Sequence, residues 1–312
     1  MADHAPKLHA PRAANSIPAS ASSSPEMITS RDNKWLKSFR AVLQGTGPKE
    51  GEPLGVEGPK LIEEAVRAGR ELDALLVSVT GECELARILD AAKNSDAGIA
   101  RTRILRTTDK LFSSIAATET PQGVAALFHQ PKWTFDDVLR GAPSPEGAFR
   151  GDAALVVVLT GVQDPGNVGT ILRSAEAFGA TGAAAARGTA DPWSPKAIRA
   201  SAGSAMRLPL LRGIAAPVLL AQLRMAQLKI FVASAHAPHD HPSASAPSKP
   251  PADLTQPCAI FIGSEGSGVA PEIERSSDAV FSIPMADSVE SLNAGVAASV
   301  VLYDAARQRK PL

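Results

Sequence analysis

Three turns in the second half of the sequence carry side chains that could do chemistry. The first begins at Thr160 and leads to Asn167 and Arg173, the second is 263–268, and the third is 291–293. Each follows an apolar run of the kind that forms a strand. Because open α/β sheets bind ligands at the carboxyl ends of their strands, these turns are candidates for one ligand site.

The side chains of the first two turns limit what the site can bind. Asn167 is placed to cap a helix, and an arginine with apolar neighbours, here Arg173, is suited to an anion or a carboxylate. The second turn, Gly-Ser-Glu-Gly-Ser-Gly, exposes backbone N–H groups without bulk and can wrap a flat ligand. It lacks the Gly-Lys-Ser/Thr ending of a phosphate loop, and Glu265 disfavours a polyphosphate. The first turn lacks the G-x-G-x-x-G spacing of dinucleotide sites.

Each turn alone also has a plainer interpretation. The first is then a helix cap with a structural ion pair, and the second is an ordinary glycine turn. The third is a strand, a turn and a core helix whose packing stripe is Leu292, Val296, Val300 and Tyr303. That interpretation explains the helix but leaves the polar turn at 291–293 without a role.

The second domain, expected at 152–312, must position these turns. Apolar, β-branched runs predict strands at 154–161, 181–188, 206–213, 229–235, 258–264 and 279–284. Helical patterns lie at 167–180, 194–203 and 216–227, and a last helix follows Asn293. Ser194 is the expected N-cap of the second helix, before Pro195. Alternation of strands and helices predicts an α/β fold with a mainly parallel sheet covered on both faces.

The first domain, expected at 27–140, is a small α/β unit. Helices are predicted at 31–44, 58–70 and about 83–93, and strands at 74–79, 101–108 and 123–128. Residues 1–26 and the segments 141–151 and 237–253 are rich in Ala, Ser, Pro or Gly. They are interpreted as a disordered tail, a linker and a flexible insertion, because they carry little apolar surface to bury.

Composition excludes several classes of protein. The formal net charge is zero, so a nucleic-acid partner would require a local basic patch. Cys83 and Cys258 indicate reduced thiols rather than a disulfide framework or a metal site. His236, His239 and His241 lie in the Pro/Ser-rich insertion and are not assigned to a metal. No apolar run is long enough for a membrane span and the start lacks a signal sequence, so a cytoplasmic location is expected.

The three turns together are more specific than any one of them. NVGTILRSAEAFG, then GSEG, then IPM and SLN occur in this order, and the segment resembles the SpoU/TrmH family of RNA ribose 2′-O-methyltransferases within the SPOUT superfamily. TSRDNKWLKSFR, LGVEGPKLIEEAVRAGRELDALLVS and TPQGVAAL resemble the L30e-like RNA-binding domain of rRNA-modifying members. The resemblance implies S-adenosylmethionine as cofactor, a trefoil knot in the second domain and a homodimer.

The resemblance also assigns roles to residues. Residues expected to bind the cofactor are Thr160, Gly263, Ser264, Glu265, Ile283, Pro284, Met285, Ser291 and Leu292. Arg173 is expected to hold a phosphate and stabilise the reacting oxygen, with Glu265 orienting it. Asn167 and Asn293 complete the catalytic set. Ser291 and Asn293 position either the ribose or the cofactor. Ala294-Gly295 departs from the family's usual Val-Ser and leaves the role of that position open.

An RNA-binding surface is expected on the first domain. Its basic residues are Arg31, Lys34, Lys37, Arg40, Arg101, Arg103 and Arg106. The target expected from the resemblance is 23S rRNA. The alternatives are a tRNA 2′-O-methyltransferase and a catalytically silent RNA- or ribosome-binding protein that keeps the fold.

Overall fold

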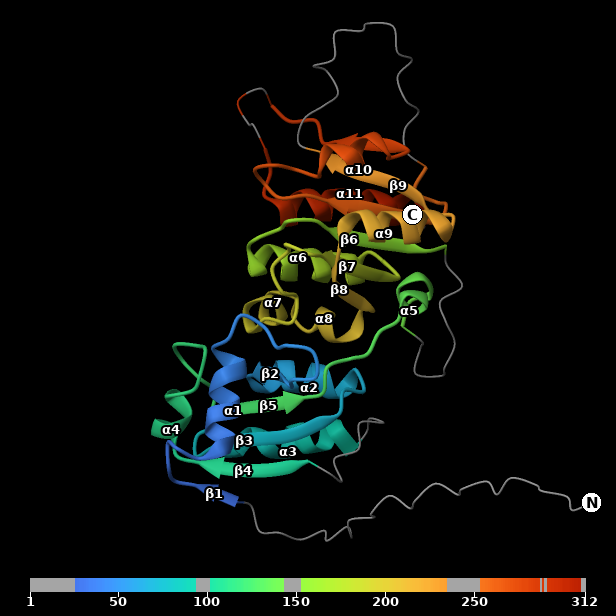
Figure 1. Ribbon diagram of the computed structural model, residues 1–312. Coiled ribbons are helices and arrows are strands. Elements are labelled where there is room, and N and C mark those ends of the chain that lie inside the picture. The colour runs from blue at the N-terminus through green and yellow to red at the C-terminus, as the bar shows by residue number, and fades with distance from the viewer. Residues whose placement is uncertain are drawn as a thin grey trace, which may run out of the picture.

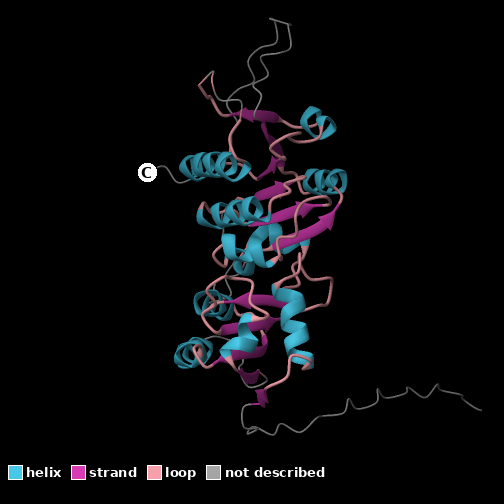
Figure 2. Cartoon of the chain, turned by 90° about the vertical axis from the view of Figure 1, so that its left-hand side faces the viewer, coloured by secondary structure: helices cyan, strands magenta, loops and turns pink. Residues whose placement is uncertain are grey.

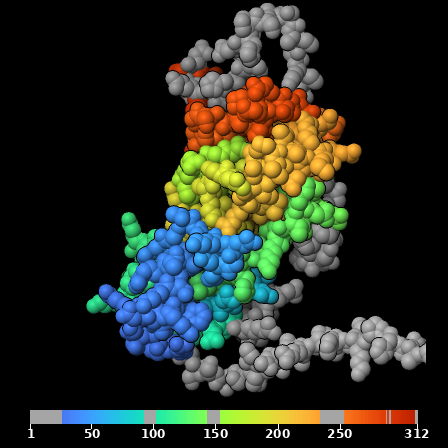
Figure 3. All heavy atoms as spheres, viewed as in Figure 1, coloured from blue at the N-terminus to red at the C-terminus, as the bar shows by residue number. Residues whose placement is uncertain are grey.

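The computed structural model describes residues 26–93, 102–142, 153–234, 253–286, 288 and 291–309. The chain forms two α/β domains, one stacked on the other (Figures 1 and 3). Most of the predicted tail, linker and insertion lies outside the described residues. Glu26, which was assigned to the tail, instead begins the first strand.

The N-terminal domain is built on a mixed sheet. Within the described residues its strands run in the order β1-β4-β3-β5-β2, with β5 antiparallel to both of its neighbours. The strands are β1 (Glu26–Ile28), β2 (Leu54–Glu57), β3 (Leu72–Ser78), β4 (Arg103–Thr107) and β5 (Val124–Phe128). The helices are α1 (Lys34–Leu43), α2 (Pro59–Arg67), α3 (Glu82–Lys93) and α4 (Asp109–Ser113).

Each helix of this domain covers one face of the sheet. The α1 and α4 side chains Phe39 and Phe112 are buried on one face, and the α2 and α3 side chains Ile62 and Ile88 on the other. The three predicted helices and three predicted strands are present. The short elements β1, β2 and α4 were not predicted, because runs of three to five residues carry too little periodicity to recognise.

The C-terminal domain is built on a sheet in which all strand pairs are parallel. Within the described residues the order is β11-β9-β10-β6-β7-β8. The strands are β6 (Leu155–Leu159), β7 (Gly182–Ala186), β8 (Leu210–Ile214), β9 (Lys229–Ser234), β10 (Cys258–Ile262) and β11 (Ala279–Ser282). The helices are α5 (Phe135–Arg140), α6 (Pro165–Ala177), α7 (Pro195–Ala200), α8 (Ser204–Arg207), α9 (Ala216–Met225), α10 (Pro271–Arg275) and α11 (Ala294–Arg309).

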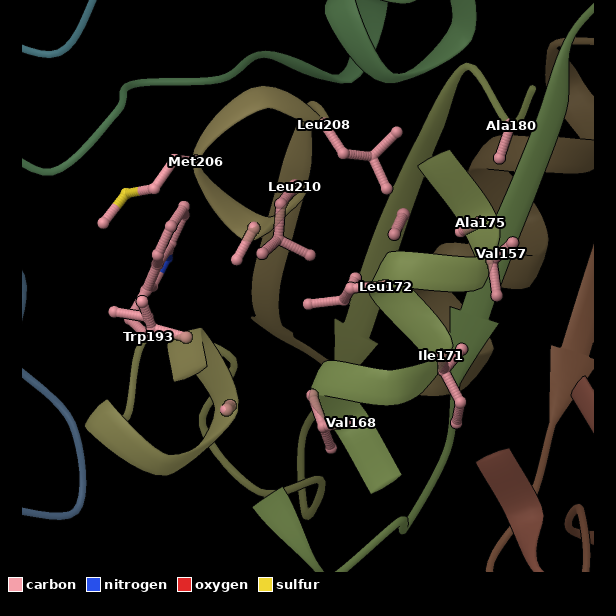
Figure 4. Packing of buried hydrophobic residues seen from close by; sticks show 14 of the residues in the cluster. Val157, Val168, Ile171, Leu172, Ala175, Ala180, Trp193, Met206, Leu208 and Leu210 are labelled. Atoms are coloured by element: carbon pink, nitrogen blue, oxygen red, sulfur yellow. The ribbon is translucent and has the colours of Figure 1, made fainter. Parts of the chain in front are cut away.

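Helices lie on both sides of this sheet (Figure 2). The central strands β6 and β10 are buried along their whole length, as continuous apolar runs in parallel sheets predict. Side chains of α6, α7, α8 and α11 pack on one face, and those of α5, α9 and α10 on the other. Figure 4 shows Val168, Ile171, Leu172 and Ala175 projecting from α6 into the first of these clusters.

The predictions for residues 206–207 and for the buried face of α11 are wrong. Residues 206–207 were assigned to a strand but belong to α8, which Gly203 initiates with a φ of 88°; the strand begins only at Leu210. On α11, Val296, Val300 and Tyr303 are 50%, 43% and 52% exposed, so they do not form the packing stripe. The side of α11 that carries mostly smaller residues packs against the core instead. Its buried residues are Ala294, Gly295, Ala298, Val301, Leu302 and Ala305.

Two arginines of the C-terminal domain join it to the N-terminal domain. Arg207 pairs with Glu176 of α6 through two hydrogen bonds of 2.6 and 2.8 Å, and with Glu64 of α2 at 2.6 Å. Arg212 pairs with Asp191 and donates to Pro48 O and Gln130 Oε1 at 2.8 and 2.9 Å. One apolar cluster also runs through both domains.

Helix α5 lies at the boundary between the domains. Residues 135–140 were expected in the first domain, yet Val138 of α5 packs in the apolar cluster on the C-terminal sheet. Its capping box at Thr134 and Asp137 fixes where the helix begins. The first helix of the C-terminal domain, α5, therefore precedes the predicted linker in the sequence.

Candidate active site

The three turns meet where the order of the parallel strands reverses. Chain order runs from β6 to β8 toward one edge of the sheet, whereas β9, β10 and β11 lie on the other side of β6. Ligand sites of open α/β sheets occupy this switch point. Thr160, directly after β6, donates from its backbone N and its Oγ1 to Ile262 O at the end of β10, over 2.8 and 3.2 Å.

A chain of hydrogen bonds joins the three turns. Asn167 Nδ2 donates to Glu265 Oε1, and Asn293 Nδ2 donates to Asn167 Oδ1 over 2.9 Å. Asn293 Oδ1 in turn accepts from the backbone N–H groups of Gly295 and Val296, at 2.9 and 3.3 Å, and so caps α11. Each amide uses its nitrogen toward one partner and its oxygen toward another, which fixes the orientation of both side chains.

The N-cap of α6 is Asp164. The prediction that Asn167 caps this helix is therefore wrong. The Asp164 carboxylate accepts from the Asn167 backbone N at 3.2 Å, and Pro165 occupies the first helical position. A hydrogen bond from Lys196 is the main cause that lowers the pKa of Asp164 and thus favours the ionised form of this cap. Because Asp164 takes the capping role, the Asn167 side chain is free to bridge the other two turns.

A cavity of about 300 Å³ lies beside this junction. Its wall consists of the ends of β9, β10 and β11, the glycine-rich turn, α10 and the start of α11. The lining residues are Ala233, Ile262, Gly263, Ser264, Glu265, Gly266, Ser267, Gly268, Val269, Glu274, Phe281, Ile283, Met285, Ser291, Leu292, Ala294 and Ala297. All predicted cofactor residues except Thr160 and Pro284 are among them.

The two exceptions lie next to the cavity. Thr160 is tied to the end of β10, and Pro284 is exposed between Ile283 and Met285. Several lining residues were not predicted as cofactor contacts, among them Glu274 and Ala297. Ala297 lies three residues after Ala294, a spacing that indicates a shared helix face, whereas nothing in the sequence points to Glu274.

Gly263 is required by close backbone contact within the second turn. Ser264 and Gly268 exchange backbone hydrogen bonds of 3.2 and 3.0 Å, which folds the turn back on itself. A Cβ added at Gly263 would lie 2.0 Å from Gly268 C and 2.4 Å from Val269 N. Since both atoms are backbone, a larger residue would displace the turn that forms the cavity wall.

Arg173 lies on the exposed side of α6. Among the described residues its guanidinium has no hydrogen-bond or ion-pair partner. The expected contact with Glu265 is absent from the described structure, because the Glu265 carboxylate binds Asn167 instead. An arginine without a described partner, six residues after Asn167 on the same helix, keeps all its donors available for an anion.

The departure at Ala294-Gly295 has a structural explanation. Gly295 is buried against α6, and a Cβ there would lie 3.0 Å from Thr170 Cγ2 and 3.1 Å from Asn293 Oδ1. Further along, Ser174 Oγ and Ser299 Oγ are 2.7 Å apart. Small residues therefore allow the start of α11 to approach α6 closely.

The predicted RNA-binding residues divide into two groups. Lys34, Lys37 and Arg40 follow one another along α1, and the Trp35 ring lies 5.9 Å from Lys34 Nζ and 5.7 Å from Arg103 Cζ. Arg31 precedes α1 in the same region.

Arg106 does not join this group. It lies three residues after Arg103 on β4 and so faces the opposite side of the sheet. There it binds Glu82 through two hydrogen bonds, which raise its pKa. Arg101, like His236, His239 and His241, lies outside the described residues.

Family models match both domains. Residues 154–303 match the SpoU rRNA Methylase family, and residues 48–126 match the MRM3-like substrate binding domain. An uncharacterized tRNA/rRNA methyltransferase of Synechocystis sp. is 31% identical over 283 residues, which cover 90% of this chain and 94% of that protein. The chain belongs to the SpoU rRNA methylase family.

Solved structures agree with this family membership. An AdoMet-bound rRNA methyltransferase from Sinorhizobium meliloti has a TM-score of 0.71 and 26% identity, over 90% of this chain and 97% of that one. An RNA 2′-O ribose methyltransferase has a TM-score of 0.66 and 29% identity, over 91% and 99% of the two chains. Both matches extend through the two domains, so the arrangement in Figure 1 is shared.

Proposed function

We propose that this protein transfers the methyl group of S-adenosylmethionine to a ribose 2′-hydroxyl of ribosomal RNA, with 23S rRNA as the target. The observation that carries the proposal is the hydrogen-bonded junction Glu265–Asn167–Asn293 beside a cavity of about 300 Å³, with Arg173, which has no partner among the described residues, on the same helix as Asn167. The neighbour named as a 2′-O ribose methyltransferase and the AdoMet-bound neighbour support the reaction and the cofactor.

The cavity residues suit a nucleoside cofactor. The glycine-rich turn exposes backbone groups for hydrogen bonding, while Ile283, Met285 and Leu292 offer apolar surface to a flat base. When bound, the cofactor supplies a methyl group on a sulfonium, whose leaving group is a neutral thioether. The protein then has to hold the ribose oxygen in line with this methyl group. Such alignment can contribute roughly 7–11 kcal/mol to lowering the barrier.

Arg173 acts on the RNA side of the reaction. A guanidinium is not deprotonated in proteins under physiological conditions, so it does not serve as the base. It binds the phosphate next to the target ribose and stabilises negative charge on the 2′-oxygen as the proton departs to solvent. Asn167 and Asn293 hold the first and third turns in register, which keeps Arg173 at a fixed position relative to the cavity.

The match of residues 48–126 to a substrate binding domain favours RNA binding by the N-terminal domain. Its surface is the basic group on and near α1: Arg31, Lys34, Lys37, Arg40 and Arg103. Ribosomal RNA is preferred because the neighbour matched over both domains is named an rRNA methyltransferase. The protein acts in the cytoplasm.

The protein acts as a homodimer with a trefoil knot in the C-terminal domain. The exposed side chains Val296, Val300 and Tyr303 form an apolar strip along α11, and Tyr303 stacks edge-on against Phe178 at the end of α6. A second copy seated on this strip would also cover part of the α6 surface that carries Arg173.

Incubation of the purified protein with S-adenosylmethionine and rRNA from a strain that lacks the protein tests the proposal. Mapping of 2′-O-methyl groups should show one new modified ribose in 23S rRNA. Arg173→Ala should reduce transfer at least a hundredfold and leave the Kd for the cofactor within about twofold. Arg275→Ala, at an exposed arginine of α10, is the control and should retain activity. Methylation of a base, modification of tRNA alone, or full turnover by Arg173→Ala would contradict the proposal.

A further inference from the structure

The charged side chains that line the cavity all have the same sign. Among the described lining residues, only Glu265 and Glu274 carry a charge; the others are glycine, serine, alanine or apolar. No described lysine, arginine or histidine lines the cavity. A bound ligand is therefore exposed to carboxylates that no cation among the described lining residues neutralises.

The two carboxylates differ in what already binds them. Glu265 accepts a hydrogen bond from Asn167 and holds the junction of the turns. Glu274 is half-buried on α10, next to the core residue Ile273, and its carboxylate has no hydrogen-bond or ion-pair partner among the described residues. Its backbone carbonyl accepts from Ser277 Oγ at 2.7 Å, which fixes this end of the helix.

Glu272, two residues earlier on the same helix, is a natural comparison. Its carboxylate lies 3.7 Å from Arg275, it is 74% exposed, and it does not line the cavity. Helix α10 thus carries one carboxylate turned into solvent beside an arginine and one left uncompensated at the cavity wall.

We propose that Glu274 makes the cavity selective for the cationic methyl donor over the neutral product. This inference rests on the proposed function. In the reaction the 2′-oxygen forms a bond to the methyl carbon, the carbon–sulfur bond breaks with its electron pair left on sulfur, and the hydroxyl proton passes to solvent. S-adenosylmethionine therefore loses its sulfonium charge when it becomes S-adenosylhomocysteine.

A fixed negative charge near a partly desolvated ligand favours the cationic form, because carboxylate and cation attract more strongly away from bulk water. The attraction disappears when the charge disappears, and the product is then held more weakly than the substrate. Glu274 thus favours binding of the donor and release of the product without contact with the RNA. It is a specificity-determining residue and takes no part in the chemical step.

Calorimetry with three ligands tests the proposal. S-adenosylmethionine carries a sulfonium, sinefungin carries an ammonium at the same position, and S-adenosylhomocysteine is neutral there. Glu274→Gln should weaken binding of the two cations about tenfold and change the Kd of the neutral ligand less than twofold. Glu274→Asp keeps the charge and should retain most of the preference. Glu272→Gln should change none of the three affinities.

The outcomes separate this inference from the proposed function. If Glu274→Gln weakens all three ligands equally, or none of them, while wild-type protein binds the donor and methylates rRNA, only the role of Glu274 is overturned. If wild-type protein binds neither the donor nor the product, the cofactor assignment falls, and this inference falls with it. Thermal unfolding of each variant checks that an equal loss is not caused by misfolding.

Discussion

Asn293 Nδ2 donates a 2.9 Å hydrogen bond to Asn167 Oδ1, although the two residues are separated by 126 positions in the sequence. The contact joins the start of α11 to the first turn of α6, and Glu265 extends it to the glycine-rich turn. Because Asn293 Oδ1 also caps α11, one side chain both begins the last helix and aligns the three turns.

These two roles of Asn293 can be separated by substitution. Asn293→Asp keeps the acceptor for the N–H groups of Gly295 and Val296 and adds a charge that favours a helix N-terminus by about 0.3–1 kcal/mol. It removes the donor to Asn167 and places a carboxylate against an amide oxygen. We expect a melting temperature within a few degrees of wild type and a tenfold or greater loss of methyl transfer.

Asn293→Ala removes the cap as well and should lose about 1 kcal/mol of unfolding free energy. Differential scanning calorimetry and a methylation assay measure the two effects. Wild-type activity in Asn293→Asp would show that the bond to Asn167 has no functional role.

The pairing of Arg207 with Glu64 and Glu176 predicts that domain orientation affects catalysis. Glu64→Gln weakens the bond to Arg207 between the domains and the pair with Arg67 inside α2, while Glu176 still holds Arg207 through two hydrogen bonds. We expect little change in stability, about 1 kcal/mol or less for a partly exposed pair, together with unchanged cofactor affinity. The kcat/KM for RNA should fall severalfold.

Glu84→Gln is a matched control, since Glu84 is similarly exposed (27% against 26%) and pairs with Arg87 inside the N-terminal domain. Small-angle scattering reports the domain arrangement in each variant. Equal effects of the two substitutions on kcat/KM would argue against coupling through the domain boundary.

The apolar strip on α11 predicts a dimer that one lysine disrupts. Val300→Lys places a charge at the centre of the strip, and we expect light scattering to show a monomer with reduced methyl transfer. Val218→Lys on α9, where the valine is 49% exposed against 43% for Val300, should leave the dimer intact. A wild-type monomer, or a dimer that tolerates Val300→Lys, would exclude this strip as the interface.

Burial raises the pKa of the Cys258 thiol from 9.0 to about 11, although the nearby Arg309 opposes the shift. Between these values the folded protein holds a proton that the unfolded chain releases. Stability from this thiol is thus complete below pH 9 and declines as pH rises toward 11, by about 1.4 kcal/mol per pH unit.

Urea unfolding of wild type and Cys258→Ala at several pH values should show the wild-type curve falling more steeply above pH 9. Parallel curves would contradict the shift.

The exposed Cys83 should react with a thiol reagent in the folded protein, and Cys258 only after unfolding.

Sequence patterns such as helix caps and apolar periodicity predicted much of the fold, but they could not predict contacts between residues far apart in the sequence. Ser194 was predicted as a cap and is one, with its side chain accepting from Ala197 N. The same rule, applied to Asp164 before Pro165, would have identified the cap of α6, which was assigned to Asn167. The bond from Asn167 to Glu265 joins residues 98 positions apart, so no local pattern could predict it.

The face of α11 shows a second limit of sequence patterns. Both the larger stripe with Val296 and Val300 and the smaller stripe with Ala298 and Leu302 are apolar, so periodicity alone did not distinguish them. Because α6 lies close to α11, only the side of α11 with smaller residues can pack against it. The distance between the two helices depends on the assembled fold and cannot be read from the sequence. Arg103 and Arg106 show the reverse case, because strand alternation alone already places them on opposite faces.

The cavity takes its walls from Ala233 and from residues between 262 and 297, whereas the first sheet is complete at Phe128. Domains generally fold as units during synthesis, with the N-terminal one first. A growing chain can therefore finish its first domain while the cavity still lacks its walls. During translation, the protein passes through an interval in which its N-terminal domain can be folded before the chain that encloses a nucleoside cofactor has been made.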